Sequence, residues 1–182
     1  SNNDNNNDTN NKIIAKSFLD IDPPFEGSFI VIGNFPYNIS TQILFKVLDW
    51  KDQVPVVIGM FQKEVAERVA AKPGNKVYGV TSALIQPFYQ IDYLFDVPPE
   101  KFNPPPKVMS AVIKLSRKKE ALEMKSEKAY KNLVKTAFNQ RRKTLRNAVK
   151  GLFSADELKD KIFDKRAEQL SINDFASLSF KI

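Results

Sequence analysis

Four consecutive residues near the start of the chain, Asn34, Phe35, Pro36 and Tyr37, could together hold an aromatic amine. Asn34 offers an amide oxygen as a hydrogen-bond acceptor. Pro36 restricts Phe35 to extended geometry, which can point the Phe35 carbonyl outward as a second acceptor. Tyr37 adds a flat ring on which an unstacked base can lie, which offsets part of the cost of extruding that base. The four residues therefore favour a site for the amino group of adenine.

The chemistry of adenine explains why two acceptors and no base would be needed. The N6 lone pair is delocalised into the ring, so the amine is a poor nucleophile. Two oxygens that accept both N–H bonds favour a pyramidal nitrogen, whose lone pair then faces a methyl donor. No general base has to act before the attack, which suits a chain of 182 residues without histidine.

Composition removes several classes of site. The chain has no histidine and no cysteine, which excludes Ser-His-Asp and Cys-His catalysis, disulfides, and zinc sites built on imidazole or thiolate. We expect no metal site. No segment approaches the roughly 20 apolar residues of a membrane span, so no membrane partner is expected. The lack of cysteine is compatible with a reducing compartment, and we expect a cytoplasmic protein.

The pattern of apolar residues predicts an α/β sheet that positions the four residues. Residues 28–33 form a short β-branched run that ends at a glycine, a predicted buried strand. The further predicted strands are residues 54–61, 90–97 and 110–116, and the predicted helices are 39–48, with Asn38 or Ser40 as N-cap, 65–70, and 77–89, broken at Pro87. The last two strands are expected to form a hairpin across a proline-rich loop. In such sheets ligands bind at the carboxyl ends of strands, which is where Asn34 to Tyr37 lie.

Strand signals stop after Leu115, and the charge changes there. Helical spacing of apolar residues predicts amphipathic helices over 130–138 and 145–152 and a short helix over 170–178. Residues 1–113 carry 10 Lys/Arg against 12 Asp/Glu, whereas residues 114–182 carry 18 against 9, a net charge of +9. A polyanion-binding region and a solvated basic helix surface both explain this charge.

The basic segment "NQRRKTLRN", residues 139–147, is the second candidate site. If it is helical, Leu145 points inward while Arg142, Lys143 and Arg146 lie together on the outer side. Arginine forks match phosphate geometry. The predicted RNA-binding residues of this segment are Gln140, Arg141, Arg142, Lys143, Arg146 and Asn147. A solvated helix face is the alternative, and for Lys63 and Arg68 an ordinary surface role is favoured.

Four segments in the same order resemble one known family. "NFPY" resembles the Asn-x-Pro-Tyr motif of N6-adenine methyltransferases that use S-adenosylmethionine. With "IGNFPYNISTQILFKVLD", "MFQKEVAERVAAKPGNKVYGVTSALIQ", "FNPPPKVMSAV" and "NQRRKTLRN", the chain is similar from about residue 12 onward to the ribosomal RNA adenine N6,N6-dimethyltransferase family of the KsgA type. One such motif alone is weak, but four in order are specific.

The resemblance implies an architecture and an activity. We expect a polar leader (1–11), a partial Rossmann-like class I methyltransferase domain (12–117) and a small all-α RNA-binding domain (118–182). The implied activity is dimethylation of two adjacent adenosines in a hairpin near the 3′ end of small-subunit ribosomal RNA, with S-adenosylmethionine as cofactor. The implied partner is the immature small ribosomal subunit, during ribosome biogenesis, and we expect a monomer.

The resemblance also assigns roles to residues. Asn34 and the Phe35 carbonyl would hold the target amine, with Asn34 also close to the methyl donor, and Tyr37 would stack on the base. Phe102 would pack on the other face of that base, while Pro104 to Pro106 stiffen the loop. Lys107 could reach a phosphate. The alternative for these residues is an ordinary turn with core aromatics.

Two departures from the family pattern concern the cofactor. None of the six glycines forms the G-x-G turn with which family members bind the donor. The chain is therefore expected to be the C-terminal part of such an enzyme and to bind S-adenosylmethionine poorly or not at all. Ser17 stands where relatives often have an acidic residue that contacts the donor's adenine, and a hydroxyl accepts a hydrogen bond more weakly than a carboxylate.

Other functions remain open at this point. A large-subunit ribosomal RNA methyltransferase of the macrolide-resistance kind is one alternative, although the "QRRKTLRN" segment argues against it. A noncatalytic RNA-binding factor of ribosome assembly is another. A DNA N6-adenine methyltransferase is disfavoured, since no segment resembles a DNA target-reading domain.

Overall fold

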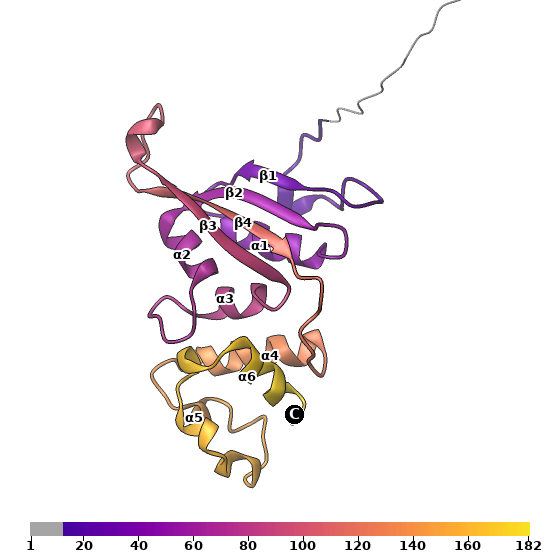
Figure 1. Ribbon diagram of the computed structural model, residues 1–182, viewed down its shortest axis with the longest axis vertical. Coiled ribbons are helices and arrows are strands. Elements are labelled where there is room, and N and C mark those ends of the chain that lie inside the picture. Colours follow the sequence, from indigo (N-terminus) through magenta and orange to yellow (C-terminus); the bar gives the residue numbers. More distant parts are fainter. Residues whose placement is uncertain (1–12) are drawn as a thin grey trace, which may run out of the picture.

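A computed structural model describes residues 13–182, so the polar leader expected at 1–11 lies outside the described residues. Figure 1 shows a sheet with helices packed against it, followed by a group of helices at the C-terminal end of the chain. The elements of the first part are η1 (Phe18–Asp20), β1 (Val31–Asn34), α1 (Ser40–Asp49), β2 (Val56–Gln62), α2 (Lys63–Ala70), α3 (Val80–Ile85), β3 (Tyr89–Val97), η2 (Pro99–Lys101) and β4 (Ser110–Arg117).

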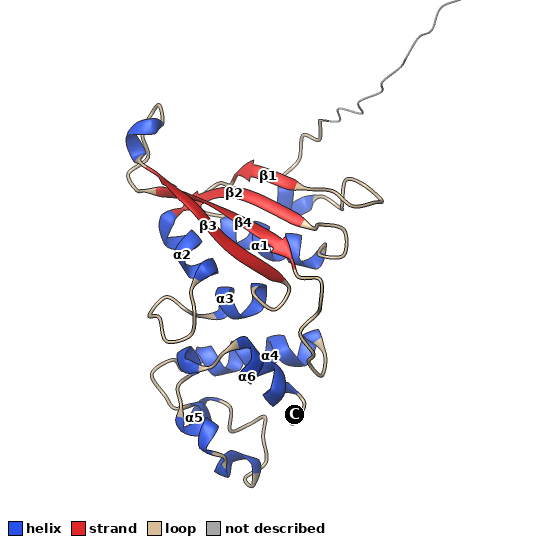
Figure 2. Cartoon of the chain, viewed as in Figure 1, coloured by secondary structure: helices blue, strands red, loops and turns tan. Residues whose placement is uncertain are grey.

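The sheet has four strands in the order β1-β2-β4-β3. β1 and β2 are parallel, whereas β4 is antiparallel to both β2 and β3. β3 and β4 form the expected hairpin across the proline-rich loop. The helices α1, α2 and α3 lie on the side of the sheet that faces the C-terminal helices (Figure 2). Burial alternates along β2 as the two-residue period of a strand requires, so that Val57 and Phe61 enter the core.

The start of α1 differs from the sequence prediction. The N-cap residue is Ile39, and no side chain caps the helix. Neither Asn38 nor Ser40 is the N-cap; Ser40 is the first residue of the helix, and its hydroxyl donates to the Tyr37 carbonyl at 3.3 Å. This bond connects the first residue of the helix to the preceding turn. The Ser40 side chain therefore stabilises the turn and does not cap the helix.

The C-terminal part is helical, as predicted. It contains α4 (Glu127–Asn139), α5 (Leu145–Ala148), η3 (Glu157–Lys159), η4 (Lys161–Asp164), η5 (Ala167–Gln169) and α6 (Ile172–Ser179). Two serines define helix starts: Ser126 accepts the Ala129 N–H at 3.0 Å, and Ser171 with Asp174 forms a capping box. The short helix predicted at 170–178 is confirmed as α6.

Two hydrophobic cores hold the molecule together. The first lies between the sheet and its helices, and the second lies among the C-terminal helices around Tyr130, Leu133 and Phe175. The second core also includes Ala71, Tyr78, Ala83 and Leu84, which precede the predicted domain boundary at 117/118. The Tyr130 hydroxyl donates to the Ala83 carbonyl at 2.7 Å. The two parts are therefore joined by packing and by hydrogen bonds.

The longest helix within residues 13–182 is α4, with 13 residues. Because a membrane span needs about 20 apolar residues, none of the described helices could cross a bilayer.

Candidate functional site

The turn after β1 is anchored in the core by Phe35. Its N–H donates to the Met60 carbonyl at 3.1 Å, and its buried ring stacks on Phe61 with centroids 4.8 Å apart. Gly59 makes room for this ring, since a Cβ at that position would overlap the rings of Phe35 and Phe61. The Phe35 side chain therefore fixes the turn, which leaves its backbone carbonyl for any role in binding.

The two candidate acceptors of the turn belong to residues that differ in exposure. Asn34 is exposed, whereas Phe35 is buried between the exposed Asn34 and Pro36. Within residues 13–182, no hydrogen bond occupies the Asn34 amide or the Phe35 carbonyl. The folded protein thus leaves both oxygens available to an external donor, as the chemistry of an amine-binding site requires.

Tyr37 is held at two points. Its hydroxyl hydrogen-bonds the hydroxyl of Ser110, which is fully buried at the first position of β4. Its carbonyl accepts the Ser40 hydroxyl. Because one bond holds the ring hydroxyl and the other holds the backbone, the orientation of Tyr37 is set before any ligand arrives, which lowers the ordering cost of binding. Ser110 was missed by the sequence prediction, and nothing in the sequence links position 110 to position 37.

The turn and the proline-rich loop form one open cavity of about 290 Å³. Its lining residues are Asn34, Phe35, Pro36, Tyr37, Phe102, Pro104 and Pro106. The peptide bond between Asn103 and Pro104 is cis. The cavity volume is just below the ~300 Å³ of the smallest typical ligand sites, which suits a ligand no larger than one planar base. The structure thus brings together two motifs that are far apart in the sequence.

Two predicted residues lie outside this cavity. Lys107 is exposed in the same loop but is not part of the lining. The Ser17 hydroxyl accepts the Leu19 N–H at 3.3 Å at the start of η1. Asn34, exposed and at the cavity, fits a contact with a methyl donor, whereas the Ser17 hydroxyl is already used as a cap. The role of Ser17 in cofactor binding stays a prediction.

The basic segment is not one helix; it spans the gap between the two helices predicted over 130–138 and 145–152. α4 ends at Asn139, Gln140 leaves the helical region with φ −122° and ψ 60°, and α5 begins only at Leu145. Leu145 is fully buried, and its N–H donates to the Lys165 carbonyl at 2.7 Å. Leu145 therefore packs in the core of the C-terminal helices.

The two partly buried arginines of this segment have intramolecular partners. Arg141 pairs with Glu168 at 3.1 Å and donates to the carbonyls of Tyr78, at 2.9 Å, and Lys76. Arg146 pairs with Asp164 and donates to the Leu158 carbonyl at 2.9 Å. Arg146 is therefore already paired within residues 13–182, unlike Arg142 and Lys143, and its role in RNA binding stays a prediction. Both arginines fasten neighbouring segments to one another.

The rest of the basic segment faces solvent. Gln140, Arg142, Lys143 and Asn147 are exposed, and within residues 13–182 Arg142 and Lys143 make no ion pair. These two cations are the part of the predicted phosphate-binding group that the fold leaves unneutralised.

Charges beside the β3–β4 hairpin are paired with one another. Lys63 lies 3.0 Å from Asp96, and the Tyr93 hydroxyl also hydrogen-bonds Asp96. The hydrogen bond from Tyr93, followed by the one from Lys63, lowers the pKa of Asp96, and the bond to Asp96 raises the pKa of Lys63. Arg68 pairs with Glu64 at 2.8 Å. Lys63 and Arg68 thus make the ordinary surface ion pairs that were favoured for them.

The sequence matches the family described as "Ribosomal RNA adenine dimethylase" over residues 1–181. The chain belongs to this family. Two curated relatives, each named "Ribosomal RNA small subunit methyltransferase A", are similar to it. The protein of Parabacteroides distasonis is 54% identical over 94% of this chain and 66% of its own length, and that of Cytophaga hutchinsonii is 56% identical over 92% and 66%. The chain thus spans about two thirds of the length of these relatives.

A solved structure shows the same fold. A dimethyladenosine transferase from Plasmodium falciparum superimposes with a TM-score of 0.74 at 26% identity, covering 88% of this chain and 67% of that one. The family resemblance and the α/β methyltransferase fold expected from the sequence are therefore confirmed.

Proposed function

We propose that this chain forms the base-binding and RNA-binding part of an S-adenosylmethionine-dependent methyltransferase. It would dimethylate N6 of two adjacent adenosines in the 3′ hairpin of small-subunit ribosomal RNA, on the immature subunit. The observation that carries the proposal is the single cavity that joins Asn34, Tyr37 and Phe102. The names of the two curated relatives support the small subunit as target. We further propose that the protein acts as a monomer in the cytoplasm.

The cavity supports a specific way of holding an adenine. Tyr37, fixed by Ser110, would stack on one face of the extruded base, and Phe102 would pack against the other face. Aromatic stacking contributes about 1–3 kcal/mol per base. That contribution is of the same order as the cost of unstacking the base, so the cavity would favour the extruded form.

The same cavity places two acceptors next to the amino group of that base. The Asn34 amide oxygen and the Phe35 carbonyl would accept the two N–H bonds of N6, because neither has a partner within residues 13–182. Bonds to both hydrogens favour a pyramidal nitrogen with its lone pair directed out of the ring plane. S-adenosylmethionine would supply an electrophilic methyl group, and Asn34 would also contact this donor.

The exposed cations near the cavity and on the helical part would hold the RNA backbone. Lys107 lies in the proline-rich loop, and Arg142 and Lys143 follow α4 with no ion pair among residues 13–182. Exposed lysines and arginines bind phosphates independently of sequence and orient the RNA. Arg141 and Arg146 would assist chiefly by fixing this segment, because their guanidinium groups have intramolecular partners.

A substitution of Asn34 tests the proposal in the protein encoded by the complete gene. Asn34→Ala removes one of the two acceptors, and loss of one oriented polar contact of this kind typically costs about 10²–10³ in rate. We expect methylation of small subunits to fall by that factor while RNA affinity stays the same. The measurement is incorporation of labelled methyl groups into purified, unmethylated small subunits.

Asn38→Ala provides a matched control, because Asn38 is also exposed but does not line the cavity. Turnover of Asn34→Ala within a few fold of the unsubstituted protein would contradict the assigned role. RNA binding without methylation by the unsubstituted protein would favour a noncatalytic assembly factor.

A further inference from the structure

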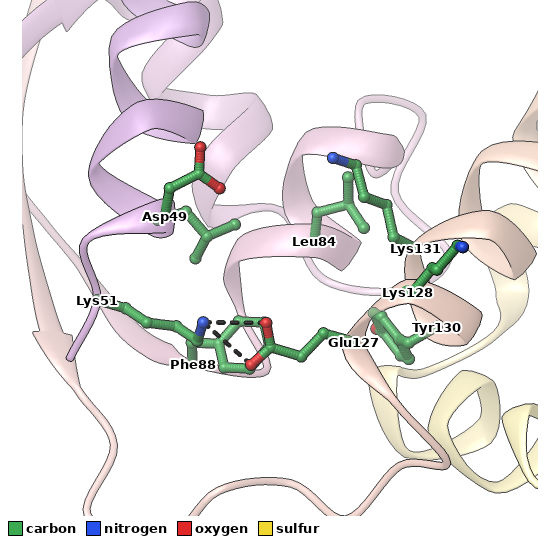
Figure 3. Close-up of a pocket in the computed structure, with 9 residues that line it drawn as sticks. Asp49, Lys51, Leu84, Phe88, Glu127, Lys128, Tyr130 and Lys131 are labelled. Atoms are coloured by element: carbon green, nitrogen blue, oxygen red, sulfur yellow. Dashed lines mark hydrogen bonds and ion pairs between the residues drawn. The ribbon is translucent and has the colours of Figure 1, made fainter.

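A basic groove lies where the C-terminal helices meet the sheet part, away from the candidate site. It consists of two adjacent cavities of about 300 and 230 Å³ that share Lys51, Phe88 and Glu127. Figure 3 shows the larger cavity, between the end of α1, α3 and the first turns of α4. We call the lining of both cavities the junction groove. Leu48, Leu84 and Phe88 give it an apolar floor.

An ion pair at the centre of the junction groove neutralises its most central carboxylate. The Lys51 ammonium lies 3.0 Å from each carboxylate oxygen of Glu127, as the dashed lines in Figure 3 mark. The same ammonium lies 5.0 Å from the centroid of the Phe88 ring. The negative charge of Glu127 is therefore neutralised by Lys51 and does not neutralise the other lysines of the groove.

The remaining charge of the junction groove is strongly positive. Its cations are Lys51, Arg117, Lys118, Lys119, Lys128 and Lys131, and its carboxylates are Asp49, Asp52 and Glu127. Within residues 13–182, Lys118, Lys119, Lys128 and Lys131 make no ion pair. Lys128 and Lys131 lie one turn apart on α4, where like charges repel.

Lys118 and Arg117 add positive charge on the other side of the ion pair. Burial lowers the pKa of Lys118, and the charge of Lys72 lowers it further, so the protein holds this cation in an unfavourable environment. Arg117 donates to the carbonyls of Lys51 and Asp52 at 2.7 and 2.9 Å, which orient its guanidinium without neutralising it. A bound anion would stabilise the charged form of Lys118 and neutralise the guanidinium of Arg117.

The junction groove is separate from the candidate site. α1 begins just after the Asn34–Tyr37 turn and ends at Asp49 in the groove. A helix of ten residues is about 15 Å long. None of the groove residues lines the cavity between the Asn34–Tyr37 turn and the proline-rich loop, which we call the base cavity. Lys128 and Lys131 also lie in the first half of α4, whereas Arg142 and Lys143 follow its C-terminal end.

We propose that the junction groove binds the phosphate backbone of an RNA segment outside the target hairpin. RNA fits better than an acidic protein segment for two reasons. Four lysines without ion pairs among the described residues line the two cavities, which suits a polymer with a negative charge at every nucleotide. The Phe88 ring in the groove could also stack on a base. The choice of RNA as the polyanion rests on the proposed function. Ribosomal RNA is large enough to contact the base cavity and the groove together.

The first test removes two groove cations from the protein encoded by the complete gene. Lys128→Ala with Lys131→Ala should weaken binding of an in vitro transcript of the 3′ domain of small-subunit ribosomal RNA several fold. The slope of log K against log salt should become shallower by about 1 to 2. Lys159→Ala with Lys161→Ala, two exposed lysines of η3 and η4, makes the same charge change and should leave the slope unaltered.

The second test changes the groove in the opposite direction. Glu127→Gln removes the carboxylate that neutralises Lys51, so RNA binding should become tighter and its salt slope steeper. Asp156→Asn is the matched control, because Asp156 pairs with the exposed Lys159 outside the groove. Thermal melting of every variant confirms folding, and if the double lysine variant does not fold, Glu127→Gln alone decides.

Salt slopes for the groove variants that equal those of their controls would overturn the proposal, and RNA binding unaffected by either change would favour an acidic protein partner. The result is independent of the Asn34→Ala experiment. Failure of that experiment with altered slopes would remove the methyltransferase assignment but keep an RNA-binding groove.

Discussion

The base cavity and the basic segment after α4 were both predicted as binding sites from short stretches of sequence, and the structure treats the two predictions differently. Around the base cavity, Asn34, Tyr37 and Phe102 come together as the motifs imply. In the basic segment, Arg141 and Arg146 pair with Glu168 and Asp164, whereas Arg142 and Lys143 make no ion pair within residues 13–182. A short motif was a better guide to the geometry than a run of charge.

The physical reason lies in the range of the forces involved. Pro36 and the buried Phe35 ring restrict the turn locally, so the direction of its carbonyl follows from neighbouring residues. The role of an arginine depends on which carboxylates and carbonyls the fold brings within about 4 Å of it. Glu168 is 27 residues from Arg141, and Asp164 is 18 residues from Arg146. No helical repeat connects residues so far apart, so only the tertiary structure identifies these partners.

The largest expected effect comes from filling the space beside Phe35. A Cβ at Gly59 would overlap the rings of Phe35 and Phe61, so Gly59→Ala must displace the anchor of the turn. Overpacking of this kind costs about 1–3 kcal/mol. We expect a lower melting temperature and loss of methylation, measured by calorimetry and methyl incorporation. Gly27→Ala, where nothing lies within 4 Å, is the control. A normal melting temperature and activity would show that core packing does not set the cavity.

The next effect separates the two kinds of arginine. Arg141→Ala removes bonds to Glu168 and the Tyr78 carbonyl and should lower the free energy of unfolding by about 1 kcal/mol, since the side chain is partly exposed and screened. Arg142→Ala should leave stability unchanged but make the salt slope of RNA binding shallower by about 1. Denaturant unfolding and binding at several salt concentrations measure both. A stable Arg141→Ala variant with weakened RNA binding would reverse the two roles.

The smallest effect concerns the hydrogen bond between Ser110 and Tyr37. Ser110→Ala should cost about 0.5 kcal/mol, because water can reach the half-buried Tyr37 hydroxyl. A more mobile ring should lower kcat/KM for methylation a few fold. Tyr37→Phe should have a similar effect, and the double variant should be no worse than either single one. Ser116→Ala, in the same strand, is the control. Additive losses would indicate that the two hydroxyls act separately.

Several features of the fold follow directly from the sequence. The two-residue alternation in β2 and β4 and the apolar stripe of α4 reflect repeating local geometry, so the succession of strands and helices along the chain, the β3–β4 hairpin and the C-terminal helices were predicted. The spatial order β1-β2-β4-β3 was not. The start of α1 was predicted wrongly, because its N-cap is Ile39 and the Ser40 hydroxyl instead bonds the Tyr37 carbonyl.

The sequence by itself determined the residue types of the base cavity and the family, since rigid prolines, stacking rings and an amide in order are local properties of the chain. Tertiary structure alone decided that Ser110 holds Tyr37 and that Arg141 and Arg146 form intramolecular ion pairs. It also decided that lysines without ion pairs among residues 13–182 gather at the junction groove. Hydrogen bonds and ion pairs act only over a few ångströms, so their partners exist only once folding has brought distant segments together.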